Sequence, residues 1–209
     1  MSHSIEFDLK RIEILNFAAD LFMTKGYEPT TVNMVLKAVG IAKGTFYYYF
    51  DSKEALMDAV IMRVIDAEIK QAKAIVACKE MSPIEKLISV LFSKPKSEDK
   101  KVIIAQLHQP HNALMKQRAM QRTLELLCPI YEQIIIEGNQ TGDFSSPAPL
   151  SDIQFLIAGM QTLYDLSGLQ DSKIEVRLSA VLTTLFCVLG IDEAKITKDQ
   201  VAARIMQQL

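Results

Sequence analysis

The chain has 209 residues, 49% of them hydrophobic, and carries a formal net charge of −2 at pH 7. A chain of this size and composition can bury a sizeable core, as one compact body or as two small domains. No apolar run approaches the roughly 18 residues that cross a bilayer, and no signal peptide opens the sequence, so we expect a cytoplasmic protein without a membrane partner.

The seven prolines are few for this length, and no segment alternates apolar and polar residues as a strand does. The sequence therefore predicts an all-α protein. Three cysteines, Cys78, Cys128 and Cys187, are far apart, odd in number and set in apolar helical contexts. This usage indicates a reducing compartment and predicts that each cysteine is a small buried hydrophobe rather than a redox sensor.

A first helix is predicted from about residue 8 to 25, and Gly26 ends it. Its expected inner stripe is Ile12, Leu15, Ala19 and Phe22.

The next stretch, residues 30–56, predicts two short helices joined by a glycine turn and followed by a long helix. A threonine pair supplies the N-cap, apolar residues then recur at helical spacing, and Gly40 stands where a left-handed C-cap residue is needed. After the turn, Phe46 and Phe50 are four residues apart and can point inward together. The arc that remains is small, polar and aromatic: Lys43, Gly44, Tyr47 and Tyr48. This is the pattern of a helix-turn-helix whose second helix enters a major groove.

Residues 8–60 resemble the N-terminal DNA-binding domain of the tetracycline-repressor (TetR) family of bacterial regulators. The resemblance is carried by the run GIAKGTFYYYFDSKEAL and by the AADLFMTKGYEPTTV that precedes it. It implies that base-reaching positions are occupied by Asn33, Lys43, Gly44, Tyr47 and Tyr48. It implies that phosphate-contacting positions are occupied by Thr31, Thr45, Tyr49 and Lys53.

The chemistry of these residue types agrees with those roles. Lysine donates to guanine O6 and N7, asparagine bridges adenine N6 and N7, and Gly44 lets the backbone approach the duplex. Tyrosine hydroxyls and Lys53, at a helix N-terminus, suit phosphate oxygens. Two alternatives stay open: the Tyr47 ring can belong mainly to the core, and Asn33 departs from the charged residues often found at its position.

Charge argues against nucleic-acid binding, because residues 1–60 hold six basic and eight acidic side chains. Affinity would then depend on a few well-placed lysines, on helix N-termini and on the symmetry of a dimer.

After the helix-turn-helix, a long helix is predicted from residue 52 to about 78. The next helix is predicted to start at the capping box Ser82-Pro83-Ile84-Glu85. Pro110 predicts a turn and Pro129 a kink. Residues 131–144, a helix closed by glycine, resemble a late-helix signature of the same family. Further helices are expected at 151–166 and 174–189, and a last short one after a capping pattern at residues 197–200.

The helices at 151–166 and 174–189 are apolar on more than one face, which predicts that they pair with a second copy of the chain, with Leu182 in the middle of the seam. An adaptable apolar pocket for a small effector is expected in the same C-terminal body. Its candidate lining residues are Gln106, His108, His111, Met115, Met160 and Tyr164. His108 and His111 lack the further ligands of a metal site, so we expect neither metal nor cofactor.

The sequence thus predicts a helix-turn-helix domain at 1–52, joined by a long helix to an effector-binding and dimerisation domain at 53–209. The expected function is that of a homodimeric transcriptional regulator, a repressor that a small apolar or amphipathic molecule releases from double-stranded operator DNA. The alternative is an accessory protein of the same fold that acts through protein partners without operator binding. An enzyme is not expected, because the sequence shows no catalytic constellation.

Overall fold

The computed structural model describes the backbone of residues 2–92, 107, 109–167 and 174–208, and side chains within 6–92, 107, 109–163 and 178–206. Every regular element in these residues is helical, which confirms the all-α prediction. In chain order, the elements are α1 (Ser2–Lys25), α2 (Val32–Val39), α3 (Lys43–Tyr49), α4 (Lys53–Ala77), α5 (Pro83–Phe92), η1 (Pro110–Asn112), α7 (Ala113–Arg122), η2 (Thr123–Leu127), α8 (Cys128–Thr141), α9 (Pro149–Ser167), α10 (Ile174–Leu189) and α11 (Lys198–Gln208).

The chain packs as two compact units. The first consists of residues 1–66 together with 96–121, and the second of residues 67–95 together with 122–209. The first unit holds α1, α2, α3 and η1, and α4 and α7 each pass from one unit into the other. The predicted boundary between functional domains, at residue 52, does not coincide with the boundary between these two packing units. That functional boundary stays a prediction.

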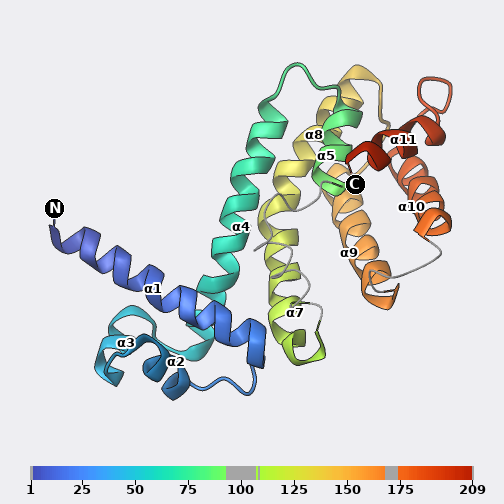
Figure 1. Ribbon diagram of the computed structural model, residues 1–209. Helices are drawn as coiled ribbons and strands as arrows, with labels where there is room; N and C mark the ends of the chain where they lie inside the picture. The colour runs from blue at the N-terminus through green and yellow to red at the C-terminus, as the bar shows by residue number, and fades with distance from the viewer. Residues whose placement is uncertain (1, 93–106, 108, 168–173, 209) are drawn as a thin grey trace. The chain divides into compact units, whose positions relative to one another are not determined.

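In the first unit, α2 and α3 lie against α1 (Figure 1). Helix α1 starts at Ser2, six residues before the predicted start. Its buried residues are Ile14, Leu15, Ala18, Phe22 and Met23, whereas Ile12 is 46% exposed and Ala19 is half-buried. The predicted inner stripe is therefore wrong at Ile12, which is exposed. Apolar residues occur on several faces of α1, and its contacts with other elements, α2 and η1 among them, decide which face is buried.

The helix-turn-helix forms as predicted. The Thr31 hydroxyl accepts a hydrogen bond from the Met34 N–H at 3.3 Å and caps α2. Gly40 ends α2 at φ 73°, in the left-handed region, and an added Cβ would meet nothing within 4 Å. This glycine is therefore required by the turn's backbone conformation and not by a shortage of space.

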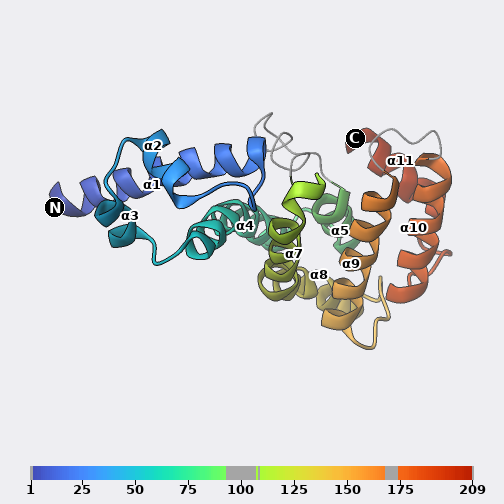
Figure 2. The ribbon, with the colours of Figure 1, turned by 90° about the horizontal axis from the view of Figure 1, so that it is seen from below.

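In the second unit, α9 contacts α8 and α10 and lies between them, while α5 contacts α8 and α11 (Figures 1 and 2). The buried residues of α10 are Leu182, Leu185, Phe186 and Leu189. Leu182 is only 2% exposed within its own subunit. Its interpretation as a residue of the dimer seam is therefore wrong, because other helices of the same chain already cover it.

The capping box at residues 82–85 is confirmed. The Ser82 hydroxyl accepts from the Glu85 N–H at 3.4 Å, and the Glu85 carboxylate accepts from the Ser82 N–H at 2.9 Å. Thr197 and Gln200 make the same reciprocal pair before α11. Helix α9 begins at Pro149, two residues before the predicted start at residue 151.

Pro129 follows a π-helical turn, η2. In that turn the Cys128 N–H bonds to the Thr123 oxygen, so the next donor in the same register would serve the Leu124 oxygen. Proline has no N–H to supply it. Instead, the Gln154 side chain on α9 donates to the Leu124 oxygen at 3.2 Å, which satisfies the carbonyl that the proline leaves unpaired.

Cys128 is buried, as predicted, and burial raises the pKa of its thiol to about 11. Cys78 is half-buried and Cys187 is exposed in the single chain, so the prediction of a buried residue is wrong for Cys187. Among the described residues, none of the helices has both the length and the apolar character needed to span a bilayer.

Candidate nucleic-acid interface

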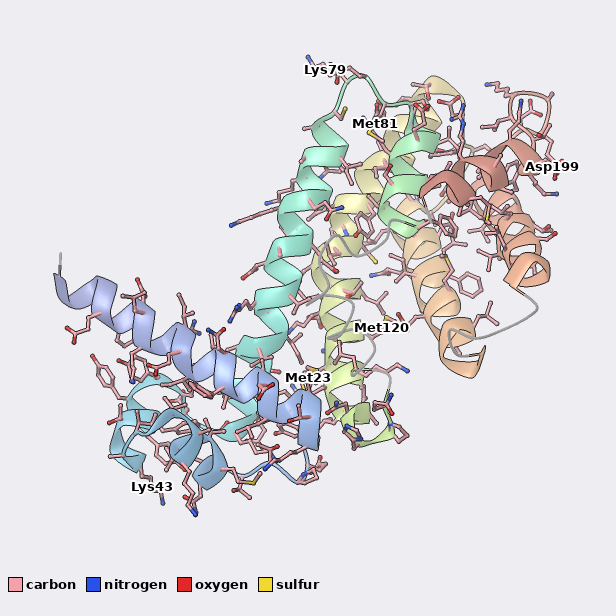
Figure 3. The ribbon with its side chains drawn as sticks, in the orientation of Figure 1. Met23, Lys43, Lys79, Met81, Met120 and Asp199 are labelled. Carbon is pink, nitrogen blue, oxygen red and sulfur yellow. The ribbon has the colours of Figure 1, made fainter. Side chains whose placement is uncertain are left out.

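The helix pair α2–α3 has a buried inner face and an exposed outer face. Val35 and Phe46 are 0% exposed and Phe50 is 4% exposed, and α2 contacts both α1 and α3. The five predicted base-reading residues all lie on the exposed side: Asn33, Lys43, Gly44, Tyr47 and Tyr48. In Figure 3, the Lys43 side chain projects from α3 on the side away from α1. The structure thus leaves all five residues accessible on two helices that contact each other.

The Tyr47 ring is not part of the core. It is 45% exposed, and the Lys43 ammonium lies 5.9 Å from its centroid. The inner face of the same helix contributes the Phe46 ring, in edge contact with Tyr47 at 5.2 Å. This placement favours the outward interpretation of Tyr47 over the core alternative.

The predicted phosphate-contacting residues flank this surface. Thr31 is exposed, and Thr45 and Tyr49 are half-buried. Lys53 is half-buried at the first position of α4, where its ammonium lies 4.1 Å from the Tyr27 ring centroid and donates to the Glu28 carbonyl at 3.2 Å. Lys53 therefore also holds the turn between α1 and α2, a structural role that its position in the sequence did not indicate.

Tyr27 is the centre of this turn. Its hydroxyl donates to the Glu54 carboxylate at 3.3 Å, and its ring packs on Phe22 with centroids 5.3 Å apart. Burial, reinforced by the Glu54 charge, raises the pKa of the Tyr27 phenol to about 12. The pKa of Glu54 is lowered, first by a hydrogen bond from its own backbone N–H and then by the Ser52 hydroxyl. The turn that leads into α2 is thus fixed by packing and by hydrogen bonds.

The acidic residues of the N-terminal segment, residues 1–60, do not lie on α2 or α3. The sequence contains no aspartate or glutamate between Glu28 and Asp51, whereas Lys37 and Lys43 fall inside that interval. Two of the carboxylates elsewhere are paired within the unit, Glu13 with Lys10 at 2.6 Å and Asp58 with Arg118 at 3.8 Å. The near-neutral charge of residues 1–60 therefore does not oppose a phosphate backbone at α2 and α3.

Two residues on α1 that sequence reasoning missed also reach α3. The Phe7 ring contacts the rings of Tyr48 and Tyr49, and the Arg11 guanidinium lies 5.2 Å from the Phe50 ring centroid. The only signal in the sequence was their spacing, because residues four apart share a helix face. That signal was lost when the helix was predicted to begin at residue 8.

The predicted effector residues are less well placed. Gln106 and His108 lie outside the described residues, as does the side chain of Tyr164. His111 packs on the turn after α1, where a Cβ on Gly26 would stand 2.8 Å from the His111 ring. Met115 is 1% exposed in the first unit, and Met160 is half-buried in the second. Their role in binding an effector stays a prediction.

Comparisons with known proteins agree with this geometry. Residues 14–60 match the family model described as bacterial regulatory proteins, tetR family. The repressor KstR2 of Rhodococcus jostii is 38% identical over 68 residues, which are 32% of this chain and 33% of the relative. The match thus spans about a third of that relative's length. The fatty acid metabolism regulator protein of Bacillus subtilis is 23% identical over 187 residues, 82% of this chain and 95% of the relative.

Solved structures share the fold over most of the chain. RolR in complex with resorcinol has a TM-score of 0.65 at 16% identity, with 95% of each chain covered. SmeT, the repressor of a Stenotrophomonas maltophilia multidrug efflux pump, has a TM-score of 0.61 at 18% identity, covering 85% of this chain and 89% of SmeT. Residues 14–60 are thus a DNA-binding domain of the tetR family of bacterial regulatory proteins, and the relatives that the chain matches are named as transcriptional regulators.

Proposed function

We propose that this regulator is a homodimeric repressor that binds a palindromic operator through α2 and α3 of each subunit. The observation that carries the proposal is the exposed surface of Asn33, Lys43, Gly44, Tyr47 and Tyr48, which lies on a helix pair without acidic residues. A recognition helix in the major groove uses such side chains to reach base edges, while flanking threonine, tyrosine and lysine contact phosphates.

The dimer would form through α9 and α10. Phe155 and Leu163 on α9 are 64% and 45% exposed in the single chain, and the exposed Gly159 lies between them on the same helix face. On α10 the exposed residues are small: Ser179, Ala180, Thr183, Thr184 and Cys187. Large apolar residues on one helix and small ones on its neighbour allow two copies to pack closely across a two-fold axis.

The effector would be an apolar or amphipathic small molecule held in the C-terminal body. Support comes from the match to the Bacillus subtilis fatty acid metabolism regulator, which extends over 82% of this chain and so includes that body. A long helix such as α4, which passes from one unit into the other, can transmit a change between them. Because two half-sites lie about 34–36 Å apart, a change in helix spacing would weaken operator binding.

Selection of genomic DNA fragments by the purified protein, followed by sequencing, tests the operator proposal. We expect a palindromic consensus with half-sites one helical turn apart, and tighter binding to it than to random DNA at each of two salt concentrations. Protein without any sequence preference at either salt concentration would reject the repressor and favour the accessory alternative.

Reciprocity tests the effector proposal. Fatty acids of graded chain length should raise the melting temperature and weaken operator binding together, and operator should weaken their binding by the same factor. Resorcinol, the ligand in the RolR complex, is the control, because it differs chemically from a fatty acid. A ligand that stabilises the protein and leaves operator affinity unchanged would contradict release by that ligand.

A further inference from the structure

A cluster of three aromatic rings joins the first turns of α1 to the recognition helix α3. The Phe7 ring centroid is 5.5 Å from that of Tyr48, edge to face, and 4.7 Å from that of Tyr49. The two tyrosine rings are themselves 5.1 Å apart and nearly perpendicular. Each ring therefore contacts the other two, and these are separations and angles at which aromatic pairs attract.

The contact extends one turn further along α1. Arg11 lies four residues after Phe7, on the same face, and its guanidinium stands 5.2 Å from the ring centroid of Phe50, the C-cap residue of α3. The same face then continues into the core of the unit, where Ile14, Ala18 and Phe22 are fully buried. The N-terminal turns of α1 are thus an extension of its core face that packs on the C-terminal half of α3.

This extension lies outside the part of the chain that matches the family model. The match begins at residue 14, after both Phe7 and Arg11, whereas α1 itself begins at Ser2. Tyr48 remains 64% exposed despite its contact with Phe7, so most of its surface is available to a ligand. Phe7 therefore orients Tyr48 without covering it.

We propose that Phe7 is a positioning residue for DNA binding, which holds Tyr48 and Tyr49 in the orientation that meets the operator. The inference rests on the proposed function, in which both tyrosines contact DNA. A side chain that is free before binding loses its rotamer freedom at the interface, and this loss lowers affinity. Two rings held by a third have lost that freedom before the DNA arrives.

The test compares three substitutions in the full-length protein. Phe7→Ala removes the ring and should weaken binding to the selected operator by about 5- to 160-fold, the effect of ordering two side chains on binding. Phe7→Tyr keeps the ring and should bind like the wild type. Phe17→Ala is the matched control, since Phe17 is a 40% exposed phenylalanine on the same helix, and it should leave affinity unchanged.

A second readout reports on the tyrosines directly. In protein with isotope-labelled tyrosine, ring resonances of Tyr48 and Tyr49 should move in Phe7→Ala and stay in place in Phe7→Tyr, because the Phe7 ring current acts on both rings. Should Phe7→Ala fail to fold, Phe7→Leu keeps apolar volume without a ring and carries the same expectations for affinity and resonances.

A double-mutant cycle shows whether Phe7 acts through the tyrosines. In a Tyr48→Ala, Tyr49→Ala background, Phe7→Ala should cause no further loss of operator affinity. An equal loss in both backgrounds would overturn the inference, because Phe7 would then act independently. Wild-type affinity in Phe7→Ala and Phe7→Leu would also overturn it while leaving the proposed function intact. If the wild-type protein itself prefers no sequence, the proposed function fails and this inference with it.

Discussion

The side-chain oxygen of Asn112 accepts a hydrogen bond from the backbone N–H of Tyr27 at 3.1 Å, across 85 residues of sequence. Asn112 is 1% exposed in η1, and Tyr27 is 2% exposed in the turn that leads from α1 to α2. The neighbouring His111 ring packs on Gly26 in the same turn. Residues of η1, which belong to the predicted effector domain, thus contact the turn that leads into α2, and one of them is hydrogen-bonded to its backbone.

Asn112→Ala should destabilise the protein by about 1–3 kcal/mol, because it leaves the buried Tyr27 N–H without its acceptor. For a chain of this length, each kcal/mol corresponds to a fall of about 2–4 °C in melting temperature. Gln109→Ala, at an exposed residue just before η1, is the control and should change stability by less than about 0.5 kcal/mol. Equal melting temperatures for the two variants would show that the Tyr27 bond contributes nothing.

Substitutions at Lys43 and Lys53 should separate base reading from phosphate anchoring. Lys43→Ala should lose about 1–3 kcal/mol on the preferred operator and little on random DNA, because Lys43 lies on the exposed surface of α3 that we propose faces the groove. Lys53→Ala should weaken binding to both DNAs and reduce the salt slope by about one. It should also lower the melting temperature slightly, since it removes the contact with Tyr27.

Lys73→Ala, at an exposed lysine of α4, is the control for general loss of charge. Fluorescence anisotropy titrations at several salt concentrations measure all three variants. Equal losses on operator and random DNA for Lys43→Ala and Lys53→Ala would contradict the division of roles.

Charged substitutions on the exposed face of α9 should give folded monomers. Phe155→Glu and Leu163→Glu change residues that the single chain leaves exposed. Each variant should therefore keep the helical circular dichroism spectrum of the wild type and sediment as a monomer, with half the mass of the wild-type dimer. Ile136→Glu, at a 40% exposed residue of α8, is the matched control and should stay dimeric. A dimer through this face would be disproved if the wild-type protein sediments as a monomer when diluted. It would also be disproved if both α9 variants remain dimers.

The features that the sequence predicted correctly are those that depend on a few neighbouring residues. Thr31 and Gly40 define the start and end of α2 through local hydrogen bonds and one left-handed residue, and Ser82 with Glu85 defines the start of α5. Such signals need no knowledge of the rest of the fold. The family resemblance likewise identified the exposed residues of α3. They lie within about one helix turn of the buried Phe46, so local helix geometry is enough to place them on the outer face.

Features that depend on contacts between distant segments could not be predicted. Ile12 and Ile14 are equally apolar, and only the packing of α1 against the rest of its unit leaves Ile14 buried and Ile12 exposed. Periodicity alone does not choose between such faces when apolar residues surround a helix. The Asn112 bond to Tyr27 and the Phe7 contact with Tyr48 join residues 85 and 41 positions apart, and neither segment carries a local signal of its partner.

Stability at acid pH should depend on Glu85. Hydrogen bonds from the Ser82 backbone N–H and hydroxyl, with the charge of Arg204, lower the pKa of Glu85 below its ordinary 4.5. Because the pKa in the folded state is the lower one, ionised Glu85 stabilises the fold above about pH 4.5, and this contribution is lost as the pH falls through the folded value. Glu85→Gln should therefore be less stable than the wild type at pH 7 and approach it on acidification.

Urea denaturation at a series of pH values measures this difference. Ser82→Ala is the companion variant, and loss of its cap should cost about 1 kcal/mol at pH 7. A constant gap between wild type and Glu85→Gln from pH 7 to acid unfolding would show that ionisation of Glu85 has no part in stability.

The last prediction concerns a buried charge in the second unit. The Lys86 side chain is 3% exposed, and its ammonium donates to both Glu137 carboxylate oxygens, at 2.9 and 2.7 Å, whereas the Glu137 side chain is 38% exposed. Glu137→Ala leaves the ammonium buried without its counter-charge and should cost about 2–4 kcal/mol, less than for a fully buried pair. Lys86→Met fills the same space without charge, and the Glu137 that remains can be hydrated, so its effect should be under about 1 kcal/mol.

The double variant distinguishes this account from a simple loss of packing. With Lys86→Met in place, Glu137→Ala should cost much less than it does alone, because no buried charge is left to compensate. Denaturant titrations of the four proteins give the coupling free energy. If Lys86→Met destabilises the protein as much as Glu137→Ala, the ion pair contributes net stability, and the penalty does not come from an uncompensated lysine.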